Sequence, residues 1–466
     1  MATPIDVVIM AAGKGTRMKS ALPKVLHRLG GRALLRHVTD CAAQLSARQA
    51  VVITGHGADE VEAALQAAPS ASLPMQFVRQ SPQLGTGHAV QQAIPRLEDD
   101  GVTLVLSGDV PLTRPATLLA LLALCGGQHL ALLTLAMADP TGYGRIVRED
   151  EHVKAIVEHK DATPAQREIT EIYSGIMAVP TRLLRTWLAR LDNQNAQQEY
   201  YLTDIVKFAV ADGQTVKAHQ ITDADEVAGV NSPLQLAELE RAYQRRVAHA
   251  LMAEGTRLAD PARIDVRGSL QCAADVEIDV GCVFEGTVQL GQGVRIDAHC
   301  VIANARIEAG AVIHPFTHID GEKLGVTVGA GALIGPFARL RPGATLGAEV
   351  HIGNFVEVKN STLAKGAKAN HLAYLGDADV GERVNYGAGS ITANYDGANK
   401  HRTVIEADVH VGSNCVLVAP VTLGAGGTIG GGSTITKDTP AGALSVARGK
   451  QLSIANWARP AKKPKA

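Results

Sequence analysis

Hydrophobic residues recur at every sixth position through much of the C-terminal half of this chain, from about residue 276 to residue 435. Separate runs keep this spacing, and all but one of their members are aliphatic. They are Ile278, Phe284, Leu290, Ile296 and Ile302; then Val328, Ile334, Leu340, Leu346, Ile352 and Val358; and last Val411, Leu417, Leu423, Ile429 and Ile435. A period of six fits neither an α-helix nor an alternating strand, but it is typical of a parallel β-helix. The pattern therefore predicts a triangular coil in which these side chains stack inward.

Glycine often directly follows the inward residue of this repeat, as at Gly291, Gly335, Gly347 and Gly353. We expect these glycines to form the corners of the coil, where the backbone torsion φ is often positive. The whole chain has 47 glycines and only 3% aromatic residues, which agrees with a narrow prism that leaves little room for rings. A propeller or a sandwich would need more aromatic residues and turns about every eight to twelve residues.

The N-terminal half has a different pattern, in which apolar runs alternate with helical stretches. The apolar runs cover residues 7–10, 51–54, 103–107 and 130–136, and the helical patterns cover residues 32–45, 57–67 and 114–124. This alternation predicts β-α-β units with a mostly parallel sheet. Residues 1–233 are therefore expected to form an α/β domain.

A helix is expected next, because Ser232 and Pro233 suit an N-cap and a first helical position. Apolar residues follow at helical spacing until Gly255, which gives a helix about 30 Å long. We interpret residues 234–254 as a semi-rigid linker, and a last helix packed on the first domain is the alternative for its N-terminal half. The β-helix domain then covers residues 255–466, and its basic end (459–466) is expected to be disordered.

Composition narrows the classes of partner. The net charge is −1 and the sequence pI is about 7.0, so the chain has no overall basic field for nucleic acid. Its six cysteines lack metal-ligand spacing and are interpreted as reduced thiols of a cytoplasmic protein. We find neither a signal-peptide pattern nor an apolar run long enough to span a membrane, so no membrane partner is expected.

A glycine- and alanine-rich loop follows the first predicted strand, with the sequence MAAGKGTRM at residues 10–18. Small residues allow backbone N–H groups to approach phosphate closely, while Lys14 and Arg17 add positive charge. The loop has neither the Walker order nor the GxGxxG pattern of dinucleotide-binding folds. Lys24 follows a proline and could reach the same phosphates.

Asp109 follows Gly108 and a predicted strand. It is therefore expected at the carboxyl end of that strand, where ligands bind in open α/β sheets. A carboxylate beside a triphosphate is most readily explained as a Mg²⁺ ligand. The alternative is an aspartate that caps the following turn.

Polar residues interrupt the C-terminal repeat in several places. They include Arg339, Arg341, Glu357, Lys359, His371 and Tyr374. Residues 392–403 leave the six-residue phase, which predicts a loop outside the prism, and such loops often carry function. A histidine suits proton transfer near neutral pH, and arginine and lysine suit a sugar phosphate. The alternative is a solvated surface with no binding role.

Together these motifs resemble the sugar-nucleotide pyrophosphorylases. Their order ahead of a hexapeptide repeat resembles one bacterial family closely, the bifunctional N-acetylglucosamine-1-phosphate uridyltransferases and glucosamine-1-phosphate N-acetyltransferases. The resemblance extends to about residue 455. It implies a Rossmann-like uridyltransferase domain, a long linker helix and a left-handed parallel β-helix that transfers acetyl groups. It also implies a homotrimer that uses acetyl-CoA, UTP and Mg²⁺ to make UDP-N-acetylglucosamine, a precursor of peptidoglycan and lipopolysaccharide.

The resemblance also assigns site residues by position. Nucleotide and sugar would be held by Met10, Ala11, Ala12, Gly13, Lys24, Gln80, Gly85, Thr86, Ser107, Gly108, Asp109, Gly144, Glu158, Tyr173 and Asn231, with Mg²⁺ on Asp109 and Asn231. His371 would accept the proton in acetyl transfer. The amino-sugar phosphate would contact Arg341, Lys359, Tyr374 and Asn385, with Glu357 placed near the amine. Acetyl-CoA would contact Ala388, Asn394, Tyr395, Ser413, Gly431 and Arg448.

Several positions depart from the family pattern. Tyr173 stands where the family usually has asparagine, Ser107 stands where it has tyrosine, and Gly431 stands where we expect alanine. Tyr173 is bulkier than asparagine and is expected to narrow or reshape the sugar pocket. Tyr173 and Ser107 also supply the only support for another alternative, a non-catalytic sugar-nucleotide-binding or regulatory subunit. The presence of Asp109, Asn231 and Lys24 opposes this alternative.

One further alternative keeps only the nucleotidyltransferase and makes the coil an oligomerisation scaffold. A scaffold would need neither His371 nor Lys359, and it would not need the Asn394–Tyr395 pair. The sequence therefore favours two reaction centres on one chain.

Overall fold

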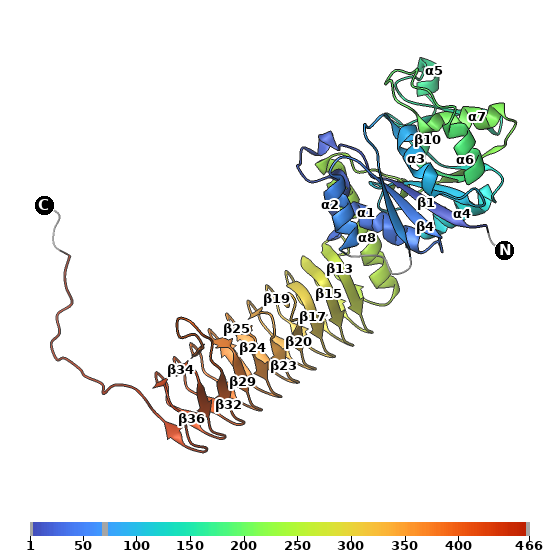
Figure 1. Cartoon of the computed structure of the whole chain (residues 1–466). Helices are drawn as coiled ribbons and strands as arrows, with labels where there is room; N and C mark the ends of the chain where they lie inside the picture. The colour runs from blue at the N-terminus through green and yellow to red at the C-terminus, as the bar shows by residue number, and fades with distance from the viewer. Residues whose placement is uncertain (1–2, 68–72, 463–466) are drawn as a thin grey trace. The chain divides into compact units, whose positions relative to one another are not determined.

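A computed structural model describes residues 3–67 and 73–462, and it divides into two compact units, Met1–Arg246 and Val247–Ala466 (Figure 1). The boundary falls inside the long helix expected after Ser232. That helix is present as α8 (Pro233–Ala253), and the Ser232 hydroxyl accepts a hydrogen bond of 3.2 Å from the Gln235 backbone N–H. No helix among the described residues has the length and apolar character needed to cross a membrane.

The first unit contains a mostly parallel sheet in the order β11-β7-β10-β6-β1-β4-β5. Its strands are β1 (Ile5–Met10), β4 (Gln49–Thr54), β5 (Met75–Arg79), β6 (Val102–Ser107), β7 (Leu130–Ala136), β10 (Glu171–Pro180) and β11 (Val216–Ile221). Strand β10 alone in this path runs antiparallel to its neighbours β6 and β7. The short strands β8 (Arg145–Glu149) and β9 (His152–Val157) extend from β10 as a hairpin. The predicted α/β sheet is confirmed.

Helices cover both faces of this sheet, which explains why its strands read as continuous apolar runs. The helices are α1 (Leu34–Ala43), α2 (Ala58–Gln66), α3 (Thr86–Ala93), α4 (Pro115–Cys125), α6 (Thr181–Leu188) and α7 (Ile205–Ala211). In β1, Val7 and Ile9 pack with the residues of α1, α2 and α4, while Val8 packs with α3, α6 and α7. Alternate side chains of one strand therefore belong to two separate cores.

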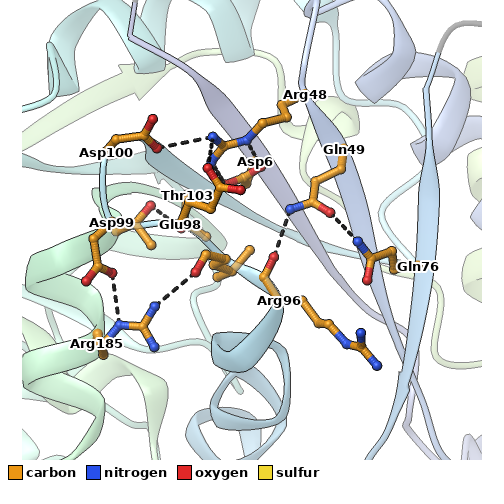
Figure 2. A network of polar contacts seen from close by, with 12 residues as sticks. Asp6, Arg48, Gln49, Gln76, Arg96, Glu98, Asp99, Asp100, Thr103 and Arg185 are labelled. Carbon is orange, nitrogen blue, oxygen red and sulfur yellow. Dashed lines mark hydrogen bonds and ion pairs between the residues drawn. The ribbon is translucent and has the colours of Figure 1, made fainter.

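The amino ends of the central strands share a polar network, shown in Figure 2. Asp6 of β1 is fully buried, and its two carboxylate oxygens accept hydrogen bonds of 3.0 and 2.5 Å from Arg48. Arg48 also donates to Glu98 and Asp100 on the surface. These bonds raise the pKa of Arg48 and neutralise a carboxylate that would otherwise be buried alone.

The second unit is a parallel β-helix, as the period of six predicts. Strands stack from coil to coil in register, so that Arg339 pairs with Glu357 and Glu357 with Tyr374. Every inward residue that the repeat predicts is at most 5% exposed. Residues 459–462 are exposed and have no regular secondary structure, and the rest of the basic end lies outside the described residues.

The predicted reason for the glycines is mostly wrong. Gly291, Gly347 and Gly353 directly follow inward residues, and none of them has φ in the left-handed region. A Cβ atom there would lie 2.7, 2.9 and 2.0 Å from the backbone of the adjacent coil, so coil stacking requires glycine at these positions. Gly335, with φ of 97°, is an exception. Positive φ falls mostly at the third residue after the inward one, and sometimes at the second, as at Asn304 and Asn360. Phe337 (φ 56°) shows that glycine is not obligatory there.

Candidate active sites

A cavity of about 440 Å³ opens at the carboxyl ends of β1 and β6. Ten of the predicted nucleotide-site residues line it: Met10, Ala11, Ala12, Gly13, Lys24, Gln80, Gly85, Thr86, Ser107 and Asp109. Lys14 lines it as well, together with Val25, Gln83, Ala89 and Glu199, which sequence reasoning missed. The topology explains this convergence, because the chain leaves each parallel strand at the same edge of the sheet.

Lys24, Asp109 and Asn231 form one polar cluster at this cavity. Lys24 Nζ lies 2.5 Å from Asp109 Oδ2 and 3.2 Å from Asn231 Oδ1. The Asp109 carboxylate and the Asn231 amide are oxygen donors of the kind that Mg²⁺ prefers, and a cation already lies between them. The residues therefore fit a divalent metal ion.

Any metal ion here would need further ligands from outside the protein. Among residues 3–67 and 73–462 there is no group of three or more His, Cys, Asp and Glu side chains that could hold one. Phosphate oxygens and water would have to complete the coordination shell, which is usual for Mg²⁺ bound with a nucleotide.

Gln80 is held in a fixed orientation beside the cavity. It is 4% exposed, and its amide nitrogen donates a hydrogen bond of 2.9 Å to the Gly85 carbonyl. Gly85 has φ of 108°, and a Cβ atom there would lie 2.7 Å from the Tyr200 carbonyl oxygen. The Thr86 hydroxyl accepts a hydrogen bond of 3.0 Å from the Leu202 N–H. These contacts give a rigid polar edge that suits recognition of a flat base.

Glu158 and Gly144 lie beside each other, and neither lines the first cavity. The Glu158 carboxyl accepts a hydrogen bond of 3.0 Å from the Thr203 hydroxyl, and burial raises the pKa of Glu158. A Cβ atom on Gly144 would lie 3.7 Å from Glu158 Oε1 and 2.8 Å from an Ile156 methyl group, so glycine keeps the space beside the carboxyl open. Glu158 lines a second cavity of about 340 Å³ rather than the first one.

The remaining two residues of the predicted nucleotide-site set lie inside the protein. Gly108 packs between strands, and its N–H donates to the Met10 carbonyl. Tyr173 of β10 is 8% exposed and packs in the core with Val8 and Met177. Its hydroxyl is buried and has no hydrogen-bond partner among the described residues. In this conformation the hydroxyl cannot reach a ligand, and only the bulk of the ring can influence one.

Arg145 is a residue of this region that sequence reasoning missed. It is 1% exposed, and its guanidinium donates to the Tyr143 carbonyl and approaches His159 Nδ1 at 3.3 Å. Arg145 therefore connects the segment before Gly144 to the segment after Glu158. The available signal was an arginine directly after Gly144, at the start of a short strand.

In the second unit, a cluster of cations gathers on one side of the coil. Arg341 donates a hydrogen bond of 2.8 Å to Glu357, which neutralises one charge. Lys359 lies near Lys400, whose ammonium group lowers the pKa of Lys359, and burial and Arg341 add to this shift. Arg339 also pairs with Glu357, and the Asp377 carboxylate lies near Lys359, so four cations share two carboxylates. An anionic ligand would relieve this excess of positive charge. Tyr374 stacks directly on Glu357 in the next coil.

Lys400 comes from the loop predicted to leave the prism, and sequence reasoning did not single it out. The loop is a short hairpin in which Tyr395 pairs with Lys400 and the His401 N–H donates to the Asn394 carbonyl. Asp396 lies 2.6 Å from the His401 ring and accepts two backbone N–H bonds as well. Hydrogen bonds within the hairpin therefore stabilise its conformation.

His371 is exposed at the end of β27 (Lys368–His371). Its Nδ1 atom lies 2.9 Å from Oδ1 of Asn354, the residue stacked beneath it one coil earlier. An amide oxygen can only accept, so Nδ1 carries the hydrogen and Nε2 is left as the proton acceptor. Asn354 was missed by sequence reasoning, although it holds the same place in its coil as His371.

The predicted acetyl-CoA residues lie in later coils. The Asn394 amide donates to the Asp377 carboxylate at 2.5 Å, and the Arg448 guanidinium donates to the Gly431 carbonyl at 2.8 Å. The Gly432 N–H donates to the Ser413 carbonyl, and the Asn414 N–H donates to the Ala388 carbonyl.

The predicted acetyl-transfer residues do not form one connected set within the chain. Asn385 begins strand β30 (Asn385–Tyr386) and pairs with Lys368, which begins β27, whereas His371 ends β27. Asn385 lines a groove with Lys368 and His410. Within the described part of the chain, no hydrogen bond or ion pair joins His371 to the Arg341 cluster. The set is therefore distributed over the coil surface.

An α/β nucleotidyltransferase-like sheet with a polar cavity at its strand ends, followed by a hexapeptide-repeat coil, defines a two-domain transferase. Residues 7–175 match the model of the MobA-like NTP transferase domain, and residues 325–360 match that of the bacterial transferase hexapeptide (six repeats). The chain belongs to the family of the bifunctional protein GlmU. It is a bifunctional enzyme of UDP-N-acetylglucosamine biosynthesis, with uridyltransferase and acetyltransferase activities, and it uses a nucleotide and acetyl-CoA as substrates.

Relatives match over nearly the whole length of the chain. It is 80% identical to bifunctional protein GlmU of Polaromonas naphthalenivorans (strain CJ2), with 99% of each chain covered. It is 57% identical to the protein of that name from Janthinobacterium sp. (strain Marseille), covering 98% of this chain and 99% of the relative. Among solved structures, a UDP-glucose pyrophosphorylase complexed with UDP-glucose aligns with a TM-score of 0.44 at 18% identity, over 52% of this chain and 99% of that one.

Proposed function

We propose that the cavity at the ends of β1 and β6 binds UTP and Mg²⁺. Backbone N–H groups of residues 12–14 and the side chains of Lys14 and Lys24, which line the cavity, would offset the phosphate charge. Arg17, exposed in the same loop, would add a further positive charge. A phosphate oxygen of N-acetylglucosamine-1-phosphate attacks the α-phosphorus of UTP, and pyrophosphate leaves. Mg²⁺ on Asp109 and Asn231 would stabilise charge on the bridging and leaving oxygens. Support comes from the Lys24–Asp109–Asn231 cluster, which combines a cation with oxygen donors at the cavity wall.

The sugar is proposed to lie toward Gly144 and Glu158. The Glu158 carboxyl has room for a ligand hydroxyl because no side chain stands at residue 144. Tyr173 would set the volume of this region through its ring, since its hydroxyl is enclosed by the protein.

For acetyl transfer we propose that His371 Nε2 accepts the proton of the glucosamine amine as it attacks the thioester of acetyl-CoA. Coenzyme A thiol leaves, and N-acetylglucosamine-1-phosphate is the product. Arg341 and Lys359, together with Lys400, would hold the sugar phosphate. The single observation that carries this proposal is the excess of cations beside Glu357, which a mere scaffold would not need.

A homotrimer with sites between neighbouring copies is also proposed. An exposed ladder of rings runs along one corner of the coil, with centroids 5.3, 5.1 and 5.5 Å apart from His299 through Phe316 and Phe337 to Phe355. The three phenylalanines are 52%, 47% and 57% exposed, and Leu372, beside His371, continues the apolar corner. Exposed apolar surface of this extent favours a protein partner. A second copy could also bring Asn385 or Arg448 to His371.

The cellular setting is proposed to be the cytoplasm. All six cysteines are free thiols, and five of them are buried. Free thiols in this number agree with a reducing compartment.

The test is an end-point assay on the purified full chain with glucosamine-1-phosphate, acetyl-CoA, UTP and Mg²⁺. Omission of acetyl-CoA should stop N-acetylglucosamine-1-phosphate formation, and omission of UTP or Mg²⁺ should stop only the second step. Formation of a UDP-sugar without Mg²⁺ would contradict the proposed metal role. Pyrophosphate release without acetyl-CoA would show that the first site accepts the non-acetylated sugar.

A further inference from the structure

The nucleotide cavity contains a protein cation at the place proposed for the metal ion. Lys24 Nζ contacts both Asp109 Oδ2 and Asn231 Oδ1. The side chains of Lys24 and Asp109 are only 14% and 17% exposed, so solvent ions screen this pair less than a surface ion pair. One ammonium group therefore contacts both side chains that would bind the metal ion, through Asp109 Oδ2 and Asn231 Oδ1.

We propose that Lys24 closes the metal site of the nucleotide-free protein and opens it when a nucleotide binds. The metal ion and the nucleotide would then bind as a coupled pair. This inference rests on the proposed function, in which Asp109 and Asn231 hold Mg²⁺. An ammonium group and a divalent cation on these same two oxygens would lie close together, and like charges repel strongly in a partly buried site, so the two cations compete for the oxygens.

The position of the Lys24 stem gives the nucleotide a way to move the ammonium group. A Cβ atom on Gly15 would lie 2.7 Å from Lys24 Cβ, so the base of the side chain is next to the glycine-rich loop. A phosphate held by that loop is within the reach of a lysine side chain, whose stem has several rotatable bonds. Phosphate oxygens offer Lys24 a charge-assisted partner in exchange for Asp109, which then becomes free for the metal ion.

Lys14 provides a matched control. It lines the same cavity and carries the same charge, but it is exposed. In the described part of the chain it makes no contact with Asp109 or Asn231. Removal of Lys14 changes the net charge of the cavity and leaves the metal oxygens occupied by Lys24.

The experiment measures Mn²⁺ binding to the full chain by electron paramagnetic resonance of the free ion, with and without UTP. In the absence of UTP, Lys24→Met should tighten Mn²⁺ binding roughly tenfold, which is within the usual range of coupling between two sites. Also without UTP, Lys24→Arg and Lys14→Met should bind Mn²⁺ with nearly the affinity of the parent protein, whereas Lys14→Met is expected to weaken UTP binding. The factor by which UTP tightens Mn²⁺ binding should shrink in Lys24→Met.

Two results would overturn the inference. One is an unchanged Mn²⁺ affinity in nucleotide-free Lys24→Met, and the other is an equal gain in Lys14→Met, which would show that only the net charge matters. Lys24→Gln replaces Lys24→Met if that variant does not fold, as judged by circular dichroism. Asp109→Ala distinguishes failure of this inference from failure of the proposed function. If this variant binds Mn²⁺ in the presence of UTP as well as the parent does, the proposed metal site itself is wrong.

Discussion

The two reaction centres of this chain are assembled in opposite ways. In the α/β unit, residues as far apart in sequence as Gly13, Gln80 and Asp109 line one cavity. Parallel strands make this possible, because all their carboxyl ends point to one edge of the sheet. In the β-helix, His371, Asn385 and Arg448 stay in sequence order along the coil, because each coil contacts only its neighbours.

This difference predicts different dependences on assembly. The nucleotide cavity has its polar groups within one chain, so uridyl transfer should survive dilution to the monomer. The acetyl-transfer residues are spread over the coil surface, and the exposed ladder beside them offers a surface for a second copy. Variants that act on one centre at a time can test how independent the two centres are.

The largest effect is expected from loss of His371, the proposed proton acceptor on the coil. His371→Ala should lower the rate of acetyl transfer by about 10²- to 10⁴-fold, the usual contribution of a general base. Uridyl transfer from UTP to N-acetylglucosamine-1-phosphate should remain near that of the parent protein. The two activities are measured separately, by thiol release from acetyl-CoA and by pyrophosphate release. Equal loss of both would indicate a collapsed fold instead of a missing base.

Asp109→Ala should produce the converse result. Loss of a charge-stabilising group in the first site should lower uridyl transfer by roughly 10²- to 10³-fold, while acetyl transfer continues. Raising the Mg²⁺ concentration should recover part of the activity if the carboxylate serves mainly to bind the metal ion. Normal Mg²⁺-dependent uridyl transfer in this variant would remove Asp109 from the proposed site.

The polar network of Figure 2 allows the two units to be compared by stability. Arg48→Met leaves the fully buried Asp6 carboxylate without its main partner, which should destabilise the first unit by about 3 kcal/mol. Heating should then abolish uridyl transfer at a lower temperature than in the parent protein, and acetyl transfer should persist. The matched control is Arg96→Met, because the Arg96 guanidinium makes none of the contacts drawn in Figure 2. Equal loss of heat stability in both variants would assign the effect to net charge.

The same contrast explains what the sequence could predict. The coil repeats one environment, so a period of six was enough to place Ile278 and Ile435 in the core. The position of Asp109 followed from a strand ending before it. Lys400 could not be found in this way, because its approach to Lys359 depends on a hairpin outside the repeat. Asn354 could have been found, since it lies 17 residues before His371, one coil away.

A smaller effect is expected from the cation that the hairpin adds to the coil. Lys400→Met should raise KM for glucosamine-1-phosphate by about tenfold and leave kcat nearly unchanged, because a charged hydrogen bond to phosphate contributes about 1.5–3 kcal/mol. KM for acetyl-CoA should not move. Lys437, an exposed lysine of a later coil, provides the control through Lys437→Met. A fall in kcat with constant KM would place Lys400 in the chemical step instead of in phosphate binding.

The smallest effect concerns pH, and it distinguishes the proposed acetyl-transfer site on the coil from the nucleotide cavity of the first unit. The ammonium group of Lys400 lowers the pKa of Lys359, so Lys359 loses its proton at a lower pH than an isolated lysine. Phosphate binding needs the protonated form, and KM for glucosamine-1-phosphate should therefore begin to rise with pH earlier than expected for free lysine. In Lys400→Met the largest cause of the shift is removed, so the pKa of Lys359 rises and the alkaline limb of the KM profile should move to higher pH. Uridyl transfer provides the internal control, because its cavity contains neither lysine. An alkaline limb that stays in place in Lys400→Met would show that Lys359 does not bind the phosphate as a cation.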